Sequence, residues 1–92
     1  MILSFKHKGL ELFFNTGSTA GIQQSHAKKL RLQLSALNNA VTPLDMNAPN
    51  WHLHKLQGNL AEHWSITVSG NWRLTFKFNN GHAEIVDYQD YH

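Results

Sequence analysis

The sequence predicts an α+β fold in which two N-terminal helices pack on one face of a small antiparallel sheet. Three observations support this prediction. Residues 6–40 carry apolar side chains at helical spacing, residues 64–88 alternate apolar and polar side chains, and two turns rich in Gly and Asn divide that alternating stretch. Helices that precede a run of strands favour α+β over a parallel α/β sheet.

Two segments are predicted to be helical. In residues 6–15, Leu10, Phe13 and Phe14 recur at i, i+3 and i+4, and Gly17 is a suitable C-terminal stop. The second helix is expected to run from a cap at Ser25 to about Ala40. Its apolar stripe is expected to contain Ala27, Leu30, Leu34, Leu37 and Val41, widened by Leu32 and Ala36. Its other side is expected to face water or a partner through His26, Lys28, Lys29, Arg31 and Gln33.

The extended segments follow period-2 alternation. Residues 1–5 are expected to form a short first strand, and residues 41–50, which hold both prolines, a connector. Further strands are expected at residues 51–56, 64–69, 72–78 and 83–88, with turns at 57–59, 69–71 and 79–81. The sheet face away from the helices is expected to carry His54, Arg73, Thr75, Lys77 and the C-terminal tail 89–92.

Length and composition limit the class of protein. Ninety-two residues indicate one domain, and 41% hydrophobic residues suffice for a globular core. The sequence lacks the ~20 consecutive apolar residues of a membrane span. The start lacks the features of a signal peptide, and there is no Cys, so we expect a cytoplasmic protein without disulfides.

The seven histidines indicate the function of the protein more specifically than its net charge of +2 does. Histidine transfers protons, binds metals and stacks on bases. A zinc site would have to gather ligands such as His52, His54, His63, His82 and His92 from separate turns. Because the sequence has no compact Cys/His group, we expect no metal ion and no other cofactor.

A second possibility is RNA cleavage by the 2′-hydroxyl group of the substrate. This reaction needs a base, an acid and a cation that stabilises the phosphorane charge. The sequence could supply these groups from His54, Arg73, Asp90, Tyr91 and His92, if the sheet brings them together. The alternative is that these residues have no catalytic role: Arg73 and Asp90 would form a surface ion pair, and Tyr91 would be a packing residue. The Lys28, Lys29 and Arg31 cluster is likewise either a solvated helix face or a phosphate-contacting one.

Five stretches of the chain resemble one known family. They are FKHKGL at 5–10, HKLQG at 54–58, WSITV at 64–68, NWRLTF at 71–76 and DYQDYH at 87–92. Together they resemble the HigB toxins of the RelE/ParE superfamily of bacterial toxin–antitoxin systems. The resemblance implies a microbial RNase-like α+β fold and a ribosome-dependent endoribonuclease that cuts translated mRNA without metal. It also implies a HigA-like antitoxin with a helix-turn-helix domain, so that operator DNA is contacted only through the antitoxin.

The resemblance also implies roles for individual residues. His54, Asp90, Tyr91 and His92 match the positions that the family needs for cleavage, and Arg73 matches its phosphate-binding cation. We expect His54 and His92 to share proton transfer, with Asp90 as the base or as their orienting group. The residues expected to contact RNA are Lys28, Lys29, Arg31, Gln57 and Lys77.

Gln57 is a departure from the family, which often has lysine at this position. A glutamine can hydrogen-bond a base edge but cannot neutralise charge. The nearest cation, Lys55, follows His54 directly and is therefore expected on the opposite face of the strand.

Two other functions remain open. ParE-type toxins share the scaffold but inhibit DNA gyrase by binding, and a small module could simply bind ribosomal RNA. The combination of His54 with residues 90–92 favours the nuclease over the gyrase inhibitor. The basic cluster of the second helix does not discriminate, because a nuclease could use it to dock on ribosomal RNA.

Overall fold

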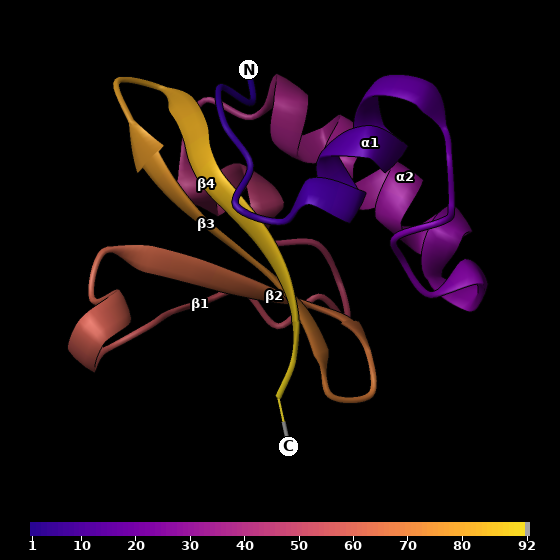
Figure 1. Ribbon diagram of the computed structural model, residues 1–92. Helices are drawn as coiled ribbons and strands as arrows, with labels where there is room; N and C mark the ends of the chain where they lie inside the picture. Colours follow the sequence, from indigo (N-terminus) through magenta and orange to yellow (C-terminus); the bar gives the residue numbers. More distant parts are fainter. Residues whose placement is uncertain (92) are drawn as a thin grey trace.

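The computed structural model describes residues 1–91 and confirms the α+β architecture (Figure 1). Helices α1 (Lys8–Thr16) and α2 (Ala27–Asn39) precede strands β1 (His54–Lys55), β2 (His63–Ser69), β3 (Trp72–Asn79) and β4 (His82–Asp90). Short 3-10 turns occupy Gln24–His26, Pro43–Met46 and Gly58–Leu60. The four strands are antiparallel and lie in the order β1-β2-β3-β4.

Both helices pack on one side of the twisted sheet (Figure 1). Ile66, Leu74 and Phe76 contribute the sheet side of a single core, and Leu10, Leu30, Leu34 and Leu37 contribute the helix side. Along β3 the core residues alternate with Arg73, Thr75 and Lys77. These three residues therefore belong to the face that points away from the helices.

Helix α1 begins and ends through identifiable caps. The Nδ1 atom of His7 accepts a hydrogen bond from the Leu10 N–H at 2.9 Å, so the helix starts at Lys8 rather than Lys6. Gly17 adopts φ 82°, and its N–H donates to the Phe13 carbonyl at 2.8 Å. This left-handed conformation favours glycine and confirms the predicted stop.

The prediction of a Ser25 cap was wrong. Ser25 lies inside the 3-10 turn Gln24–His26, and α2 begins at Ala27 with His26 in the flanking position. His26 was expected to face water, but only 8% of its surface is exposed. Its ring packs edge-on against Trp72 and Tyr88 instead.

Three further expectations for α2 were wrong for geometric reasons. Gln33 falls between Leu30 and Leu37 on the buried stripe, is fully buried, and donates from Nε2 to the Thr67 carbonyl at 2.8 Å. Leu32 lies on the opposite side of the helix and is 59% exposed. Val41 lies beyond the helix end and is 65% exposed.

The predicted strand at residues 51–56 is regular only at His54–Lys55. His52 adopts φ 53°, which interrupts the alternation. Backbone hydrogen bonds from Thr67 N–H to the Trp51 carbonyl (2.7 Å) and from Leu56 N–H to the His63 carbonyl (2.8 Å) still hold the segment beside β2. His54 pairs with Ser65 and Lys55 with Trp64, so the two side chains lie on opposite faces, as expected.

Strand β4 is longer than predicted and contains a bulge. Thr75 pairs with Asp87 but Lys77 pairs with Glu84, so the register shifts by one residue around Ile85, whose φ is 55°. Residues 1–5 do not form a full strand. Single parallel bridges, Ile2 with Ala83 and Phe5 with Val86, lay this segment along the outer edge of β4 (Figure 1).

Candidate active site

The cross-strand pairs define the residues on the sheet face opposite the helices, which we call the open face. One row crosses all four strands through His54, Ser65, Thr75 and Asp87. The neighbouring row contains Thr67, Arg73 and Gln89. Strands lie about 4.8 Å apart, so His54 and Asp87 are separated by about 14 Å at their backbones. Ser65 and Thr75, which lie between them in the row, are buried.

His54 is exposed at one end of the first row. Its Nδ1 atom lies 2.9 Å from the His52 carbonyl oxygen. A carbonyl oxygen only accepts, so the Nδ1 atom carries the hydrogen in this contact. The Nε2 atom of the neutral ring then has a free lone pair and can take a proton from a substrate.

Arg73 lies in the second row, and its guanidinium group is oriented by its own backbone. Nη1 donates to the Gly70 carbonyl at 2.6 Å and to the Trp72 carbonyl at 3.1 Å. The Nη2 and Nε groups take no part in these two bonds. They can bind a phosphate, since a guanidinium group suits two parallel bonds to phosphate oxygens.

Asp87, Gln89 and Tyr91 extend the open face along β4. Gln89 Nε2 donates to Asp87 Oδ2 at 2.6 Å, and the Tyr88 N–H donates to Asp87 Oδ1 at 2.9 Å. Burial raises the pKa of Tyr91, as does the Asp87 carboxylate, whereas Arg73 lowers it. Tyr91 therefore keeps its phenol proton and lies within the electrostatic reach of Asp87 and Arg73.

Asp87 and Gln89 were not among the predicted site residues. A count back from Tyr91 in steps of two reaches Gln89 and Asp87, so the alternation of β4 contained the signal. Gln89 was expected to lie in a tail after the strand, and the bulge at Ile85 places Asp87 on the opposite face from the one that strict alternation from Ala83 predicts.

Asp90 and His92 differ from the other predicted site residues. Asp90 pairs with Trp72, which places it on the helix side of the sheet edge. Burial is the main cause of the raised pKa of Tyr88. The negative charge of Asp90 also raises this pKa, as expected for a carboxylate near the phenol. His92 lies outside the described residues. The structure thus brings Arg73 and Tyr91 together on the open face, with His54 two strands away and Asp90 across the sheet edge.

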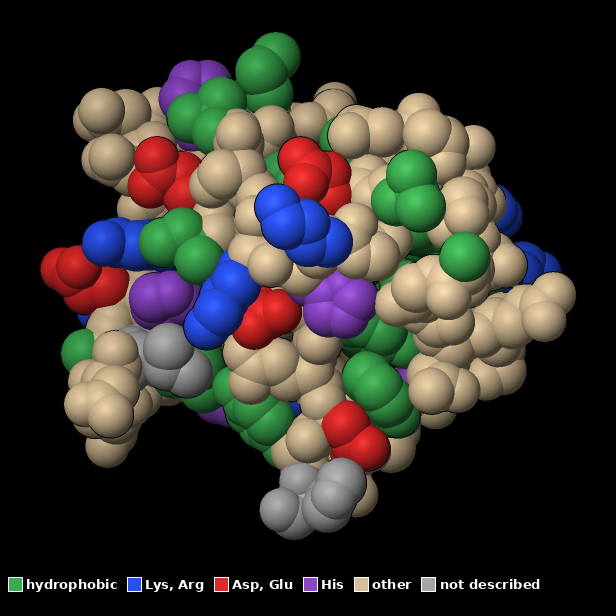
Figure 2. Space-filling view, in the orientation of Figure 1, with side chains coloured by type: hydrophobic (Ala, Val, Ile, Leu, Met, Phe, Trp, Pro, Cys, Tyr) green, Lys and Arg blue, Asp and Glu red, His purple; other side chains and the backbone are tan. Residues whose placement is uncertain are grey.

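The basic residues predicted to contact RNA are divided between the two sides of the molecule. Lys77 Nζ lies on the open face, 3.4 Å from Glu62 Oε2, and Gln57 is exposed before the turn Gly58–Leu60. The α2 residues Lys28, Lys29 and Arg31 lie in the helix layer. In the view of Figure 2, basic, acidic and histidine side chains are intermixed rather than sorted into one positive patch.

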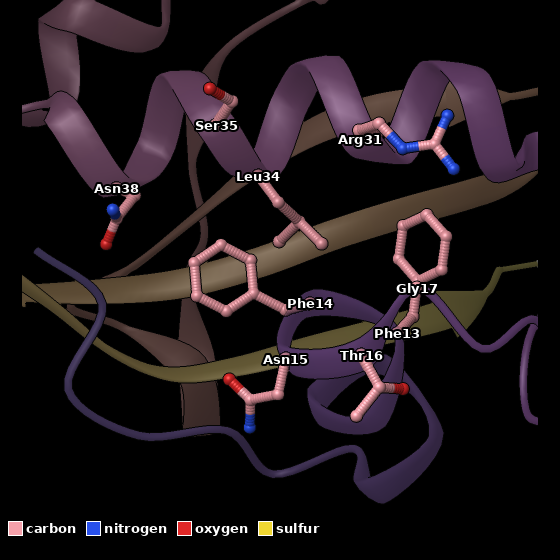
Figure 3. Close-up of a pocket in the computed structure, with 9 residues that line it drawn as sticks. All are labelled: Phe13, Phe14, Asn15, Thr16, Gly17, Arg31, Leu34, Ser35 and Asn38. Atoms are coloured by element: carbon pink, nitrogen blue, oxygen red, sulfur yellow. The ribbon is translucent and has the colours of Figure 1, made fainter.

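Within that layer, Arg31 also packs against α1. Its guanidinium carbon lies 5.5 Å from the centre of the Phe13 ring, in a groove of about 360 Å³ between α1 and α2 (Figure 3). Lys28 and Lys29 line a different hollow with Ser25 and Leu32. Lys28 and Arg31 are three residues apart in α2 and are therefore neighbours on the helix surface, so an RNA-contacting role for the three residues stays a prediction.

Residues 1–91 contain neither a cluster of metal-binding side chains nor a membrane-spanning helix. No three His, Cys, Asp or Glu side chains are grouped so that they could hold a metal ion. None of the helices in this part of the chain is long and apolar enough to cross a membrane.

Two helices on one side of a four-stranded antiparallel sheet, with an imidazole, a guanidinium and a phenol on the other side, define a small RelE-like α+β domain. The model of the family described as "RelE-like toxin of type II toxin-antitoxin system HigB" matches residues 3–92. The chain belongs to this family. It is also 45% identical over 92 residues, which cover 100% of both chains, to Endoribonuclease HigB of Proteus vulgaris.

Proposed function

We propose that this protein is a ribosome-dependent endoribonuclease that cuts translated mRNA by metal-independent acid–base chemistry. Membership of the HigB-like family makes it the toxin of a type II toxin–antitoxin system. Full-length identity of 45% to an endoribonuclease supports the nuclease activity. The observation that carries the mechanism is the open face, where the free Nε2 of His54 and the oriented guanidinium of Arg73 lie on one side of the sheet.

The proposed reaction uses the 2′-hydroxyl of the RNA as the nucleophile. A base removes its proton, the 2′-oxygen bonds to phosphorus, and the bond from phosphorus to the 5′-oxygen breaks. An acid protonates the leaving 5′-oxygen, so the products are a 2′,3′-cyclic phosphate and a 5′-hydroxyl. His54 is suited to the base or acid role through Nε2, because its Nδ1 is held by the His52 carbonyl.

The other residues of the proposed site act on the phosphate and on the second proton. Arg73 stabilises the charge on the phosphorane oxygens. Tyr91, which retains its phenol proton, aligns the substrate nucleotide. Asp90 and His92 supply the remaining acid–base capacity. His92 shares proton transfer with His54, and Asp90 is the base or the group that orients one of the two histidines.

The proposed partners follow from the family and from the charge distribution. The type II system supplies an antitoxin, for which we propose a HigA-like protein with a helix-turn-helix domain. Operator DNA is then bound only through the antitoxin. The small ribosomal subunit and its mRNA are the substrate complex, with Lys28, Lys29 and Arg31 on ribosomal RNA and Gln57 and Lys77 beside the mRNA. Translated mRNA places the toxin in the cytoplasm.

Programmed ribosomes test this proposal directly. Purified protein is mixed with an mRNA whose codon fills the decoding site, beside the same RNA without ribosomes and a reaction containing EDTA. We expect cuts only with ribosomes, undiminished by EDTA and ending in a cyclic phosphate. Cleavage of free RNA would contradict ribosome dependence, and loss of cleavage in EDTA, with ribosomes kept intact by polyamines, would contradict the metal-free mechanism. Growth arrest without any cleavage would contradict the nuclease and favour gyrase inhibition.

A further inference from the structure

A polar and aromatic cluster lies beneath the end of β4, on the helix side of the sheet. The Nδ1 atom of His26 lies 2.5 Å from the Tyr88 hydroxyl oxygen. Trp72 stacks on Tyr88 with 4.5 Å between ring centres, and His26 packs edge-on against Trp72 at 5.5 Å. Trp72 is also the cross-strand partner of Asp90. The cluster therefore contacts the part of β4 that leads into the proposed site.

The hydrogen bonds in this cluster have a definite direction. The Gln23 N–H donates to the Tyr88 hydroxyl oxygen at 3.4 Å, so that oxygen is an acceptor there. The Tyr88 proton is then free to point at His26 Nδ1, which accepts it as a neutral ring. Burial lowers the pKa of His26 and raises that of Tyr88, and both changes maintain these protonation states.

The end of β4 extends beyond its hydrogen bonds to residues 1–7. Backbone hydrogen bonds join residues 1–7 to Ala83 and Val86, and the Ile85 N–H donates to the Ser4 Oγ, so these bonds reach no further along β4 than Val86. Beyond this point β3 holds one edge of β4, and the Tyr91 N–H donates to the Asn71 carbonyl at 2.8 Å. The side-chain bond to His26 connects the same stretch to the helix layer.

His26 is itself held in a fixed position. It joins the turn Gln24–His26 to α2, and the preceding loop lies against α1 at a glycine pair. A Cβ atom on Gly9 would come within 2.5 Å of the Gly21 carbonyl oxygen, and a Cβ on Gly21 within 2.5 Å of the Gly9 Cα. The bond to Tyr88 therefore ties β4 to a packed part of the fold rather than to a mobile loop.

We propose that His26 and Tyr88 are positioning residues, whose hydrogen bond holds the end of β4 so that Asp90 and Tyr91 meet the RNA in the geometry that cleavage requires. This inference rests on the proposed function. A buried polar pair with both partners satisfied fixes one arrangement, whereas an apolar contact would allow small displacements. A displacement of about 1 Å at reacting groups can slow catalysis about 100-fold.

The first test measures the position of β4 without any cleavage reaction. Tyr88→Phe removes only the hydroxyl group and keeps the ring stacked on Trp72. His26→Leu removes the acceptor, whereas His26→Asn retains an acceptor oxygen near the place of Nδ1. We expect amide hydrogen exchange at Tyr91 to accelerate in Tyr88→Phe and His26→Leu and to remain closer to wild type in His26→Asn. Unchanged Tyr91 exchange in both disrupting variants would overturn the proposal.

The second test measures single-turnover cleavage and ribosome affinity of the same variants. We expect Tyr88→Phe to cleave about tenfold more slowly at saturating ribosomes, with affinity within about twofold of wild type, and His26→Asn to recover most of the His26→Leu loss. Phe14→Leu in α1 is the stability control, because it weakens the packing of Phe14 against Phe5 and leaves both partners of the His26–Tyr88 bond in place. An equal rate loss in this control, at matched stability, would overturn the proposal in favour of general destabilisation. If the wild type itself did not cleave, the proposed function would fail, and the exchange experiment would still decide the positioning role.

Discussion

Asp90 and Tyr91 are neighbours in the chain but lie against opposite faces of the sheet. Asp90 pairs with Trp72 on the helix side, where its charge acts on Tyr88. Tyr91 lies on the open face, within the electrostatic reach of Asp87 and Arg73. In the proposed mechanism, the acid–base group Asp90 and the substrate-aligning group Tyr91 therefore approach the RNA from two sides of one sheet edge.

The first prediction concerns the titration of Tyr91. Asp87→Asn removes a negative charge that opposes ionisation, so the pKa of the Tyr91 phenol should fall. Arg73→Gln removes a positive charge that favours ionisation, so the pKa should rise. Titration of the two tyrosines by carbon NMR, assigned with Tyr88→Phe, measures both changes. Shifts of the same sign in the two variants would show that Tyr91 does not lie between these charges.

The second prediction concerns the phosphate clamp. Arg73→Gln should lower the single-turnover cleavage rate about 100- to 1,000-fold, because it removes the cation from the phosphorane. Arg73→Lys should recover only part of this loss, since an ammonium group cannot make the paired bonds of a guanidinium. Lys6→Gln, which removes one charge from an exposed site, serves as the matched control. If Arg73→Gln and Lys6→Gln lowered the cleavage rate equally, Arg73 would contribute only to the net charge of the protein and not to a phosphate clamp.

The third prediction concerns His54. His54→Ala should slow cleavage about 100- to 10,000-fold while leaving ribosome affinity largely unchanged, because general acid–base catalysis contributes to the rate in this range. His63→Ala is the control. His63 belongs to the open face, but it pairs with Lys77, away from the row that contains His54. Full cleavage by the His54 variant would remove this residue from the mechanism.

The fourth prediction concerns stability and pH. The pKa of His26 is lowered in the folded protein from its ordinary value of 6.5 because the ring is buried. As pH falls through 6.5, the unfolded chain takes up a proton that the folded protein still excludes, so the unfolding free energy falls. Above 6.5 both states are neutral and this contribution to stability is fully present.

Urea unfolding of wild type and His26→Asn at about pH 7.5 and about pH 5 measures this effect. The variant should lose less stability between the two values, while the contributions of other groups, including the nearby His7 and Asp90, largely cancel in the comparison. An identical pH dependence in the two proteins would show that His26 titrates normally.

The fifth prediction concerns Lys28 and Lys29. Replacing both with glutamine should weaken ribosome binding and reduce its dependence on salt, because fewer phosphates are neutralised. The cleavage rate at saturating ribosomes should stay near wild type, since these residues lie in the helix layer, away from the open face. Binding measured at several salt concentrations, together with single-turnover rates, separates the two quantities. A lower saturated rate with unchanged affinity would contradict a docking role.

The sequence predicted β2 and β3 almost to the residue, because their alternation is strict and Gly70 and Gly81 mark the turns. It also predicted which residues of β3 face the helices. Local patterns could not predict that His26 and Gln33 are buried. Their partners, the Tyr88 hydroxyl and the Thr67 carbonyl, lie 62 and 34 residues away in the chain. A polar side chain is buried when a distant group satisfies it, and a local pattern does not contain that information.

The candidate site was predictable to a similar extent. His54 and Arg73 were placed on one face by counting in steps of two, and the register agrees with that count. Asp87 lies inside the predicted strand 83–88, but strict alternation from the buried Ala83 would place it on the helix side, whereas in β4 it pairs with Thr75 on the open face. The bulge at Ile85 changes the register of β4 with β3, and no turn residue marks it in the sequence.

The most direct test of the account replaces one ribose in the RNA. An mRNA with a single 2′-deoxynucleotide on the 5′ side of the mapped cut is placed in the decoding site of programmed ribosomes, beside the unmodified RNA. If the 2′-hydroxyl is the nucleophile, cleavage at that bond stops while the toxin still binds the ribosome. Cleavage of the 2′-deoxy position at the normal rate would contradict the proposed mechanism and require water as the nucleophile.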